Sequence, residues 1–210
     1  MILIKDLIIY NEFKNKILMY IDQLCIQDNS IFIIKADSGK GKTILLKTLA
    51  NEYPYFAGNI IINNNIFESY TDKNFFTLVQ FVSQTYPLFL NMTVYKQLFN
   101  AIFYIKNEEI SIIHKKLKEV LTQLNLWDQK DKYPYQLSGG QRQRIAIIQK
   151  VLLFPKYLLL DEPTSGLDRT SKFEILNFLL KENQQGMTLI IASHDQETIN
   201  FFENKIIYNF

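Results

Sequence analysis

The stretch that decides the fold is Ile31-Phe32-Ile33-Ile34-Lys35-Ala36-Asp37-Ser38-Gly39-Lys40-Gly41-Lys42-Thr43-Ile44-Leu45-Leu46-Lys47-Thr48-Leu49-Ala50. Its first four residues form a short apolar run, which is typical of a buried strand. Its last seven residues have the apolar spacing of a helix. A glycine-rich loop between a strand and a helix presents backbone N–H groups and the positive end of the helix dipole to an anion. The stretch therefore predicts a loop that binds phosphate groups.

This phosphate loop, Ala36–Thr43, follows the pattern of Gly, four residues, Gly-Lys-Ser/Thr at every position except the first. Lys42 is expected to reach the β- and γ-phosphates of a nucleoside triphosphate, and the Thr43 hydroxyl is expected to bind Mg²⁺. The residues expected to bind the nucleotide in the loop are Ser38, Gly39, Lys40, Gly41, Lys42 and Thr43. Ala36 replaces the usual glycine, and this alanine is strained if the backbone needs a positive φ there and harmless otherwise.

Two carboxylates follow an apolar run farther along the chain. Leu158-Leu159-Leu160 is typical of a buried strand, which would carry Asp161 and Glu162 to the carboxyl edge of a sheet. Asp161 is expected to bind Mg²⁺, directly or through water, and Glu162 to accept a proton from an attacking water as general base. The plainer alternative is a strand that ends in solvated acids.

A third element, Leu137-Ser138-Gly139-Gly140-Gln141, precedes the carboxylates. Ser138 suits the N-cap position of a helix, and an amphipathic helical pattern follows directly at Arg142–Ile147. Because a flexible Ser-Gly-Gly linker does not usually run straight into such a helix, we interpret the element as a helix N-terminus that can bind an anion.

In this order, the phosphate loop, the Leu137–Gln141 element and the two carboxylates resemble the ATP-binding cassette (ABC) ATPases, the motor subunits of ABC transporters. The segment Pro163–Asp168 is also similar to the family, which has alanine more often at Gly166. A further departure is Gln149-Lys150, in place of the Arg-Ala often found there. The resemblance spans nearly the whole chain, from Phe13 to His194.

The resemblance implies a site shared between two cassettes, which face head to tail and sandwich two Mg²⁺-ATP. The residues that would contact the ATP of the other cassette are Ser138, Gly139, Gly140, Gln141 and Asp168. Gln84 would contact Mg²⁺ or the attacking water, and His194 would hydrogen-bond the γ-phosphate. The family stacks adenine on an aromatic ring. Phe13 is favoured for this role because it follows the turn-forming Asn11-Glu12, and Tyr10 is the alternative.

Strands that alternate with helices predict an α/β fold with a mainly parallel sheet. The alternating apolar pattern from Ile2 to Ile21 predicts antiparallel strands at the start of the chain. Together these patterns predict one P-loop NTPase domain over residues 1–210. Its expected parts are a catalytic core with an antiparallel β-subdomain at about 1–90 and 137–210, and an inserted helical subdomain at about 91–136.

Composition narrows the possible partners. With 23 basic and 21 acidic residues, the net charge of +2 does not indicate nucleic-acid binding. The longest uncharged stretch, Asn74–Tyr95, is too polar for a membrane span, and Cys25 is the only cysteine, which fits a reducing cytosol. We therefore expect a cytoplasmic protein that sits on the inner face of the cell membrane through a partner.

The leading functional hypothesis is an ATPase that energises transport of a substrate across a membrane. It implies a transmembrane permease subunit as partner, and a homodimer or a dimer with a second ABC ATPase. One alternative is a soluble ABC ATPase in a process such as iron–sulfur cluster assembly. Another, prompted by Ala36, is a cassette that binds ATP without hydrolysing it. The cargo and the direction of transport stay open.

Overall fold

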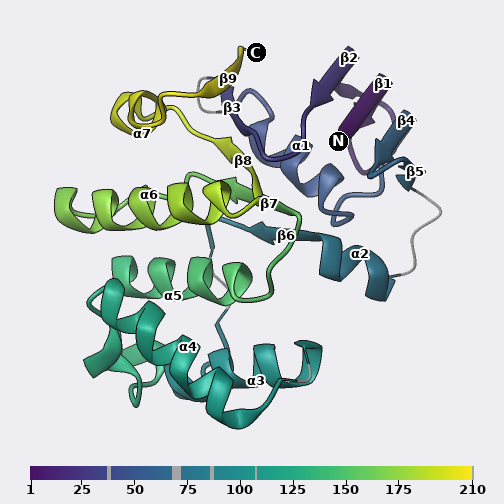
Figure 1. Cartoon of the computed structure of the whole chain (residues 1–210). Coiled ribbons are helices and arrows are strands. Elements are labelled where there is room, and N and C mark those ends of the chain that lie inside the picture. The colour runs from purple at the N-terminus through teal and green to yellow at the C-terminus, as the bar shows by residue number, and fades with distance from the viewer. Residues whose placement is uncertain (37–38, 68–71, 86–87, 107, 210) are drawn as a thin grey trace.

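The computed structural model describes residues 1–36, 39–67, 72–85, 88–106 and 108–209. Within them, an antiparallel sheet and a parallel sheet lie above a group of helices (Figure 1). The strands are β1 (Ile2–Tyr10), β2 (Ile17–Ile26), β3 (Ile31–Lys35), β4 (Phe56–Ile62), β5 (Asn65–Ile66), β6 (Val79–Val82), β7 (Tyr157–Asp161), β8 (Thr188–Ala192) and β9 (Lys205–Asn209). The helices are α1 (Lys42–Leu49), α2 (Asp72–Leu78), α3 (Val94–Lys106), α4 (Ile110–Gln123), α5 (Gly139–Val151), α6 (Arg169–Gln184) and α7 (Gln196–Phe201).

The parallel sheet has the strand order β6-β7-β8-β3-β9 and is covered on both faces. Successive residues of a strand point to opposite faces, so one strand feeds two cores. In β3, Ile31 and Ile33 pack into the core that includes α5 and α6, while Phe32 and Ile34 pack into the core that includes α1 and the antiparallel sheet. This double burial explains why the strands are continuous apolar runs, and the expected α/β fold with a mainly parallel sheet is confirmed.

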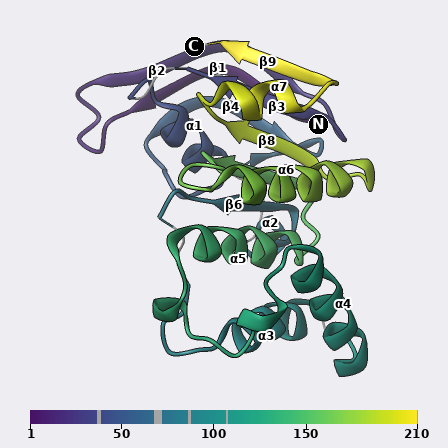
Figure 2. The same cartoon turned by 90° about the vertical axis from the view of Figure 1, so that its left-hand side faces the viewer.

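The antiparallel sheet has the order β2-β1-β4-β5, and α1 lies between it and the parallel sheet (Figure 2). Its β1–β4 pairing shifts register between Lys5 and Ile8. Asp6 has a positive φ of 50° at this irregularity, and Gly58 on the facing strand has a φ of 102°. A Cβ at Gly58 would clash with the Asp6 carbonyl oxygen and lie 2.9 Å from Leu7 Cα. The bulge therefore depends on glycine at this position.

Gly58→Ala is expected to destabilise the protein by about 1–3 kcal/mol, because the alanine is strained at positive φ and meets backbone atoms. For a chain of this size, each 1 kcal/mol lowers the melting temperature by about 2–4 °C, so the expected decrease is about 2–12 °C. Thermal unfolding measures the effect, with Asn59→Ala, an exposed neighbour on the same strand, as control. Equal melting temperatures for the two variants would contradict this account of the bulge.

The helical region, α3 and α4, lies on the side of α5 that is away from the antiparallel sheet (Figures 1 and 2). The amphipathic helix α4 buries Ile113, Leu117 and Leu121 against the core that also contains α5. Helices α3 and α4 both fall within the expected insertion, 91–136, whose limits as a subdomain remain a prediction. Among the described helices, none is long and apolar enough to cross a bilayer.

Candidate active site

The phosphate loop joins β3 to α1, as its sequence predicts. Gly39 and Gly41 have φ values of 80° and 92°, which glycine adopts without strain. The predicted ATP ligand Ser38 lies outside the described residues, as does Asp37. Ala36 is not among the described residues with positive φ, so this alanine is unstrained. The glycine that the usual pattern has at this position is not required by the backbone here.

Lys42 begins α1, and its ammonium group is buried at the centre of the site. Its Nζ donates a 2.6 Å hydrogen bond to the Ala36 carbonyl oxygen and lies 3.8 Å from Glu162 Oε1. A phosphate oxygen entering the loop could replace the carbonyl as acceptor. The loop therefore holds the Lys42 cation in place, which would reduce the ordering cost of binding an anion there.

Thr43 and Asp161 come from distant parts of the chain and meet at the carboxyl edge of the parallel sheet. Thr43 Oγ1 donates a 2.7 Å hydrogen bond to Asp161 Oδ2. Burial raises the pKa of Asp161, and the bond from Thr43 partly offsets this rise. Asp161 is only 2% exposed. A dication beside this carboxyl group would favour its ionised form.

These donors fit Mg²⁺, which binds hydroxyl and carboxylate oxygens and takes further oxygens from phosphates and water. Within the described ranges, no group of three or more His, Cys, Asp or Glu residues could hold a metal ion by itself. A dication at Thr43 and Asp161 would therefore need oxygens from the nucleotide.

Glu162 follows Asp161 directly and has the left-handed backbone φ of 49°. One carboxylate oxygen, Oε1, lies 2.6 Å from His194 Nδ1. The other, Oε2, accepts a 3.2 Å hydrogen bond from Ser193 Oγ. The turned backbone thus points the carboxylate at the end of β8 and at the predicted histidine. A carboxylate held between a histidine and a lysine at the mouth of a phosphate loop is suited to orient and deprotonate water.

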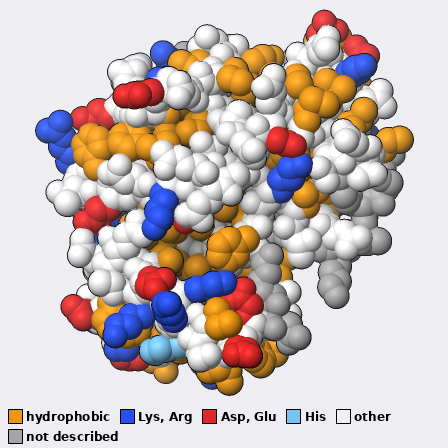
Figure 3. Space-filling view, in the orientation of Figure 1, with side chains coloured by type: hydrophobic (Ala, Val, Ile, Leu, Met, Phe, Trp, Pro, Cys, Tyr) orange, Lys and Arg blue, Asp and Glu red, His pale blue; other side chains and the backbone are white. Residues whose placement is uncertain are grey.

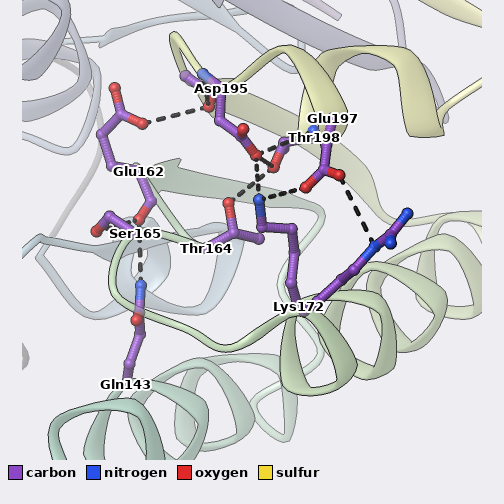
Figure 4. A network of polar contacts seen from close by, with 10 residues as sticks. Gln143, Glu162, Thr164, Ser165, Lys172, Asp195, Glu197 and Thr198 are labelled. Carbon is purple, nitrogen blue, oxygen red and sulfur yellow. Dashed lines mark hydrogen bonds and ion pairs between the residues drawn. The ribbon is translucent and has the colours of Figure 1, made fainter.

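A hydrogen bond from helix α5 holds the backbone of Glu162, and the sequence did not predict this contact. Gln143 on α5 donates a 3.1 Å hydrogen bond from Nε2 to the Glu162 carbonyl oxygen (Figure 4). The same oxygen accepts bonds from the Ser165 amide and hydroxyl. Gln143 is buried although it is polar. A polar residue on the buried face of α5 was the available signal, but only the tertiary contact identifies its partner.

Gln143→Leu is expected to lower kcat about 10-fold and to leave the KM for ATP unchanged. The substitution removes one hydrogen-bond donor to Glu162, whose backbone has a strained positive φ. It removes no group that is expected to touch nucleotide. Steady-state ATPase assays test this, with Gln123→Leu on the exposed side of α4 as control. Equal turnover in both variants would show that the Gln143 bond does not position Glu162.

A second polar network anchors the segment after His194 (Figure 4). Lys172 on α6 donates 2.9 Å bonds to Asp195 and to Glu197. Burial by itself raises the pKa of Asp195, but hydrogen bonds from Thr198 and Lys172 outweigh it and lower that pKa to about 2. Asp195 also caps α7 by accepting from the Thr198 amide. His194 is therefore held on one side by its contact with Glu162 and on the other by its chain neighbour Asp195, the N-cap of α7.

A cavity of about 820 Å³ brings most of the predicted site residues together. Its lining residues are Glu12, Leu18, Gly39, Lys40, Gly41, Lys42, Thr43, Ile44, Lys47, Glu52, Tyr53, Gln84, Asp161, Glu162 and His194. Phe13, the predicted adenine platform, is 83% exposed at the β1–β2 turn and is not in this lining, nor is Tyr10. Both rings remain predictions for adenine. Leu18 and Tyr53 do line the cavity, and no local sequence pattern indicated them.

The Leu137–Gln141 element opens α5 as predicted. Ser138 is the N-cap, its hydroxyl accepts from the Gln141 amide at 3.2 Å, and the Gln141 side chain accepts from the Ser138 amide at 2.9 Å. Gly140 packs closely, since a Cβ there would lie 3.0 Å from Leu167 Cδ2, whereas a Cβ at Gly139 would meet nothing within 4 Å. Gly139 thus exposes the helix end to a ligand.

The predicted contacts to a second nucleotide lie outside the cavity. Ser138, Gly139, Gly140 and Gln141 are absent from its described lining. Asp168 is the N-cap of α6, and its hydrogen bond from the Ser171 amide lowers its pKa. On the face drawn in Figure 3, basic and acidic side chains are interspersed.

Comparison with known proteins places this chain in a family. The family model described as ABC transporter matches residues 22–165. TTE0246 of Caldanaerobacter subterraneus, described as an ABC transporter ATP-binding protein, is 37% identical over 84% of this chain and 74% of its own. The sulfate/thiosulfate import ATP-binding protein CysA of Pseudomonas aeruginosa is 36% identical over 88% of this chain, which spans only 56% of CysA.

Among solved structures, the dimeric post-hydrolysis state of the ATP-binding cassette MJ0796, bound to ADP and Pi, superposes with a TM-score of 0.86. It is 25% identical and covers 99% of this chain, which in turn covers 94% of MJ0796. The fold, the phosphate loop, the paired carboxylates and the helix-capping Leu137–Gln141 element occur here together. The chain is therefore an ATP-binding, ATP-hydrolysing member of the ABC transporter family.

Proposed function

We propose that this chain energises the movement of a substrate across a membrane, by hydrolysing Mg²⁺-ATP held between two ABC ATPase subunits. The observation that carries the proposal is the convergence of Lys42, Thr43, Asp161, Glu162 and His194 in one cavity. These are the groups needed to bind a triphosphate, hold Mg²⁺ and activate water. Their presence argues against a cassette that only binds ATP.

Each residue has a distinct part in the proposed reaction. Lys42 exchanges the Ala36 carbonyl for β- and γ-phosphate oxygens. Thr43 and Asp161 would hold Mg²⁺, which neutralises charge on the phosphates when bound. Glu162 orients the attacking water and accepts its proton. His194, whose ring is already beside Glu162, hydrogen-bonds the γ-phosphate, and Gln84 reaches the water or Mg²⁺ from the β6 side.

The proposed site is completed by a second subunit, either another copy of this chain or a different ABC ATPase. Ser138 and Gly139 stand at an open helix N-terminus, yet they do not line the cavity of their own chain. A helix N-terminus favours an anion, and in a head-to-tail pair it would meet the γ-phosphate bound by the partner. Asp168 would contribute from the same side.

A surface for a membrane partner lies beside α3. An apolar groove of about 620 Å³ runs between α3, α5 and the end of β6. The apolar and aromatic lining residues are Phe76, Phe81, Val82, Leu88, Phe89, Met92, Ala101, Tyr104, Ile105, Ala146 and Leu153. A groove of this kind can hold an amphipathic helix. We propose that it receives a helix of a transmembrane permease, which would hold this chain at the inner face of the membrane.

The experiment that tests the proposal is affinity purification of the chain from gently solubilised native membranes. We expect a membrane-spanning protein to be recovered in stoichiometric amount and to alter the ATPase rate. Recovery from the soluble fraction with no membrane protein would instead favour a cytosolic ABC ATPase, such as one in iron–sulfur cluster assembly.

A further inference from the structure

The apolar groove contains two polar side chains that are not satisfied by the described part of the chain. Gln97, on the first turns of α3, is only 2% exposed and lines the groove. Neither its amide nitrogen nor its amide oxygen has a hydrogen-bond partner among the described residues. A buried amide without partners is costly, and because Gln97 lines the groove, a turn of its side chain would bring the amide to a ligand that supplies them.

Among the described residues that line the groove, Lys150, in the last turn of α5, is the only charged one. Its Nζ lies over the Phe76 ring, 5.6 Å from the centroid, and forms no ion pair within 4.0 Å in the described ranges. Burial lowers the pKa of Lys150, and the charge of Glu52 opposes this. The ammonium group is thus partly desolvated, and the Phe76 ring gives it a cation–π contact.

The rim of the groove is aromatic and open, with Phe89 59% and Tyr104 76% exposed. Among its described lining residues, the groove is a mainly apolar surface with one cation, which is complementary to an apolar helix that carries one acid.

We propose that the partner helix in this groove presents an Asp or Glu carboxylate to Lys150 and a hydrogen-bonding polar group to Gln97. This rests on the proposed function, which supplies the membrane partner, and adds the chemistry by which that partner is recognised. A protein helix fits better than anionic lipid headgroups, because lipid-binding sites use clusters of basic residues and the described lining of this groove has one.

Carbodiimide cross-linking tests the contact directly in the complex purified from membranes. This reagent condenses an amine with a carboxylate that touches it and leaves no spacer. Peptide mass spectrometry is expected to find a peptide containing Lys150 joined to an Asp or Glu of the membrane-spanning protein. A link from Lys150 only to Glu52 of the same chain, or no link at Lys150, would overturn the proposal.

Variants supply the second measurement. Lys150→Met is expected to reduce recovery of the membrane protein by about 30-fold or more, since it leaves the partner's carboxylate buried and unpaired. Lys150→Arg should retain most of the recovery, and Lys118→Met, on the exposed side of α4, should retain all of it. The ATPase rate and melting temperature of the isolated Lys150→Met chain report whether it is folded.

The outcomes separate the two proposals. If the unaltered chain recovers no membrane protein, the proposed function fails and this inference fails with it. If the unaltered chain and Lys150→Met recover the membrane protein equally, only the carboxylate contact is wrong. Binding of the isolated chain to phosphatidylglycerol vesicles, lost in Lys150→Met, would assign the lysine to lipid and also overturn the proposal.

Discussion

Glu162→Gln is expected to reduce ATP turnover by about 100- to 10,000-fold while ATP binding is retained. The amide keeps the shape of the side chain but cannot accept a proton from water. The carboxylate it replaces is fixed from several sides, by His194 at 2.6 Å, by Ser193 at 3.2 Å and by Gln143 through the backbone. Because the phosphate loop is untouched, the variant should accumulate as an ATP-bound dimer.

The measurements are steady-state phosphate release and size-exclusion chromatography with and without Mg²⁺-ATP. Glu203→Gln, the same change at an exposed position, is the matched control and should behave as the unaltered chain. Turnover in Glu162→Gln equal to that of the control would remove Glu162 from the role of general base. A variant that neither turns over nor binds ATP would point to a structural role.

Ser138→Asn is expected to lower turnover about 100-fold and to leave the ATP affinity of the isolated subunit unchanged within about twofold. Asparagine caps helices as well as serine does, so α5 should keep its N-terminus. The change removes the hydroxyl proposed to donate to the γ-phosphate bound by the partner subunit. Affinity is unaffected because Ser138 does not line the cavity of its own chain.

Lys42→Met is expected to show the opposite pattern to Ser138→Asn. It should lower the ATP affinity of the isolated subunit about 100-fold. Its ammonium group lies within the cavity, where it would contact the phosphates. Nucleotide titration at concentrations below dimerisation measures affinity, and steady-state assays measure turnover. If Ser138→Asn weakened ATP binding in the isolated subunit as Lys42→Met does, the proposal that two subunits share each nucleotide site would be wrong.

Several features of the fold were predictable because their signals are local. Ile31–Ile34 and Leu158–Leu160 are apolar enough to specify strands buried on both faces, and both are strands. The glycines of the phosphate loop and the Ser138 cap encode backbone shapes within a few residues. By contrast, α2 and α7 are short helices without a clear periodic pattern, and they were not predicted.

The candidate site likewise has features that local sequence predicts and features that depend on tertiary contacts. By itself, the sequence determined which chemical groups are present and which motif each belongs to, since phosphate loops, caps and strand-end acids are set by neighbouring residues. Only the tertiary structure decided that Thr43 bonds Asp161, that Gln143 supports Glu162 and that Gln97 and Lys150 share one groove. These pairs come from elements far apart in the chain, and their side chains meet only because the helices pack together and against the parallel sheet.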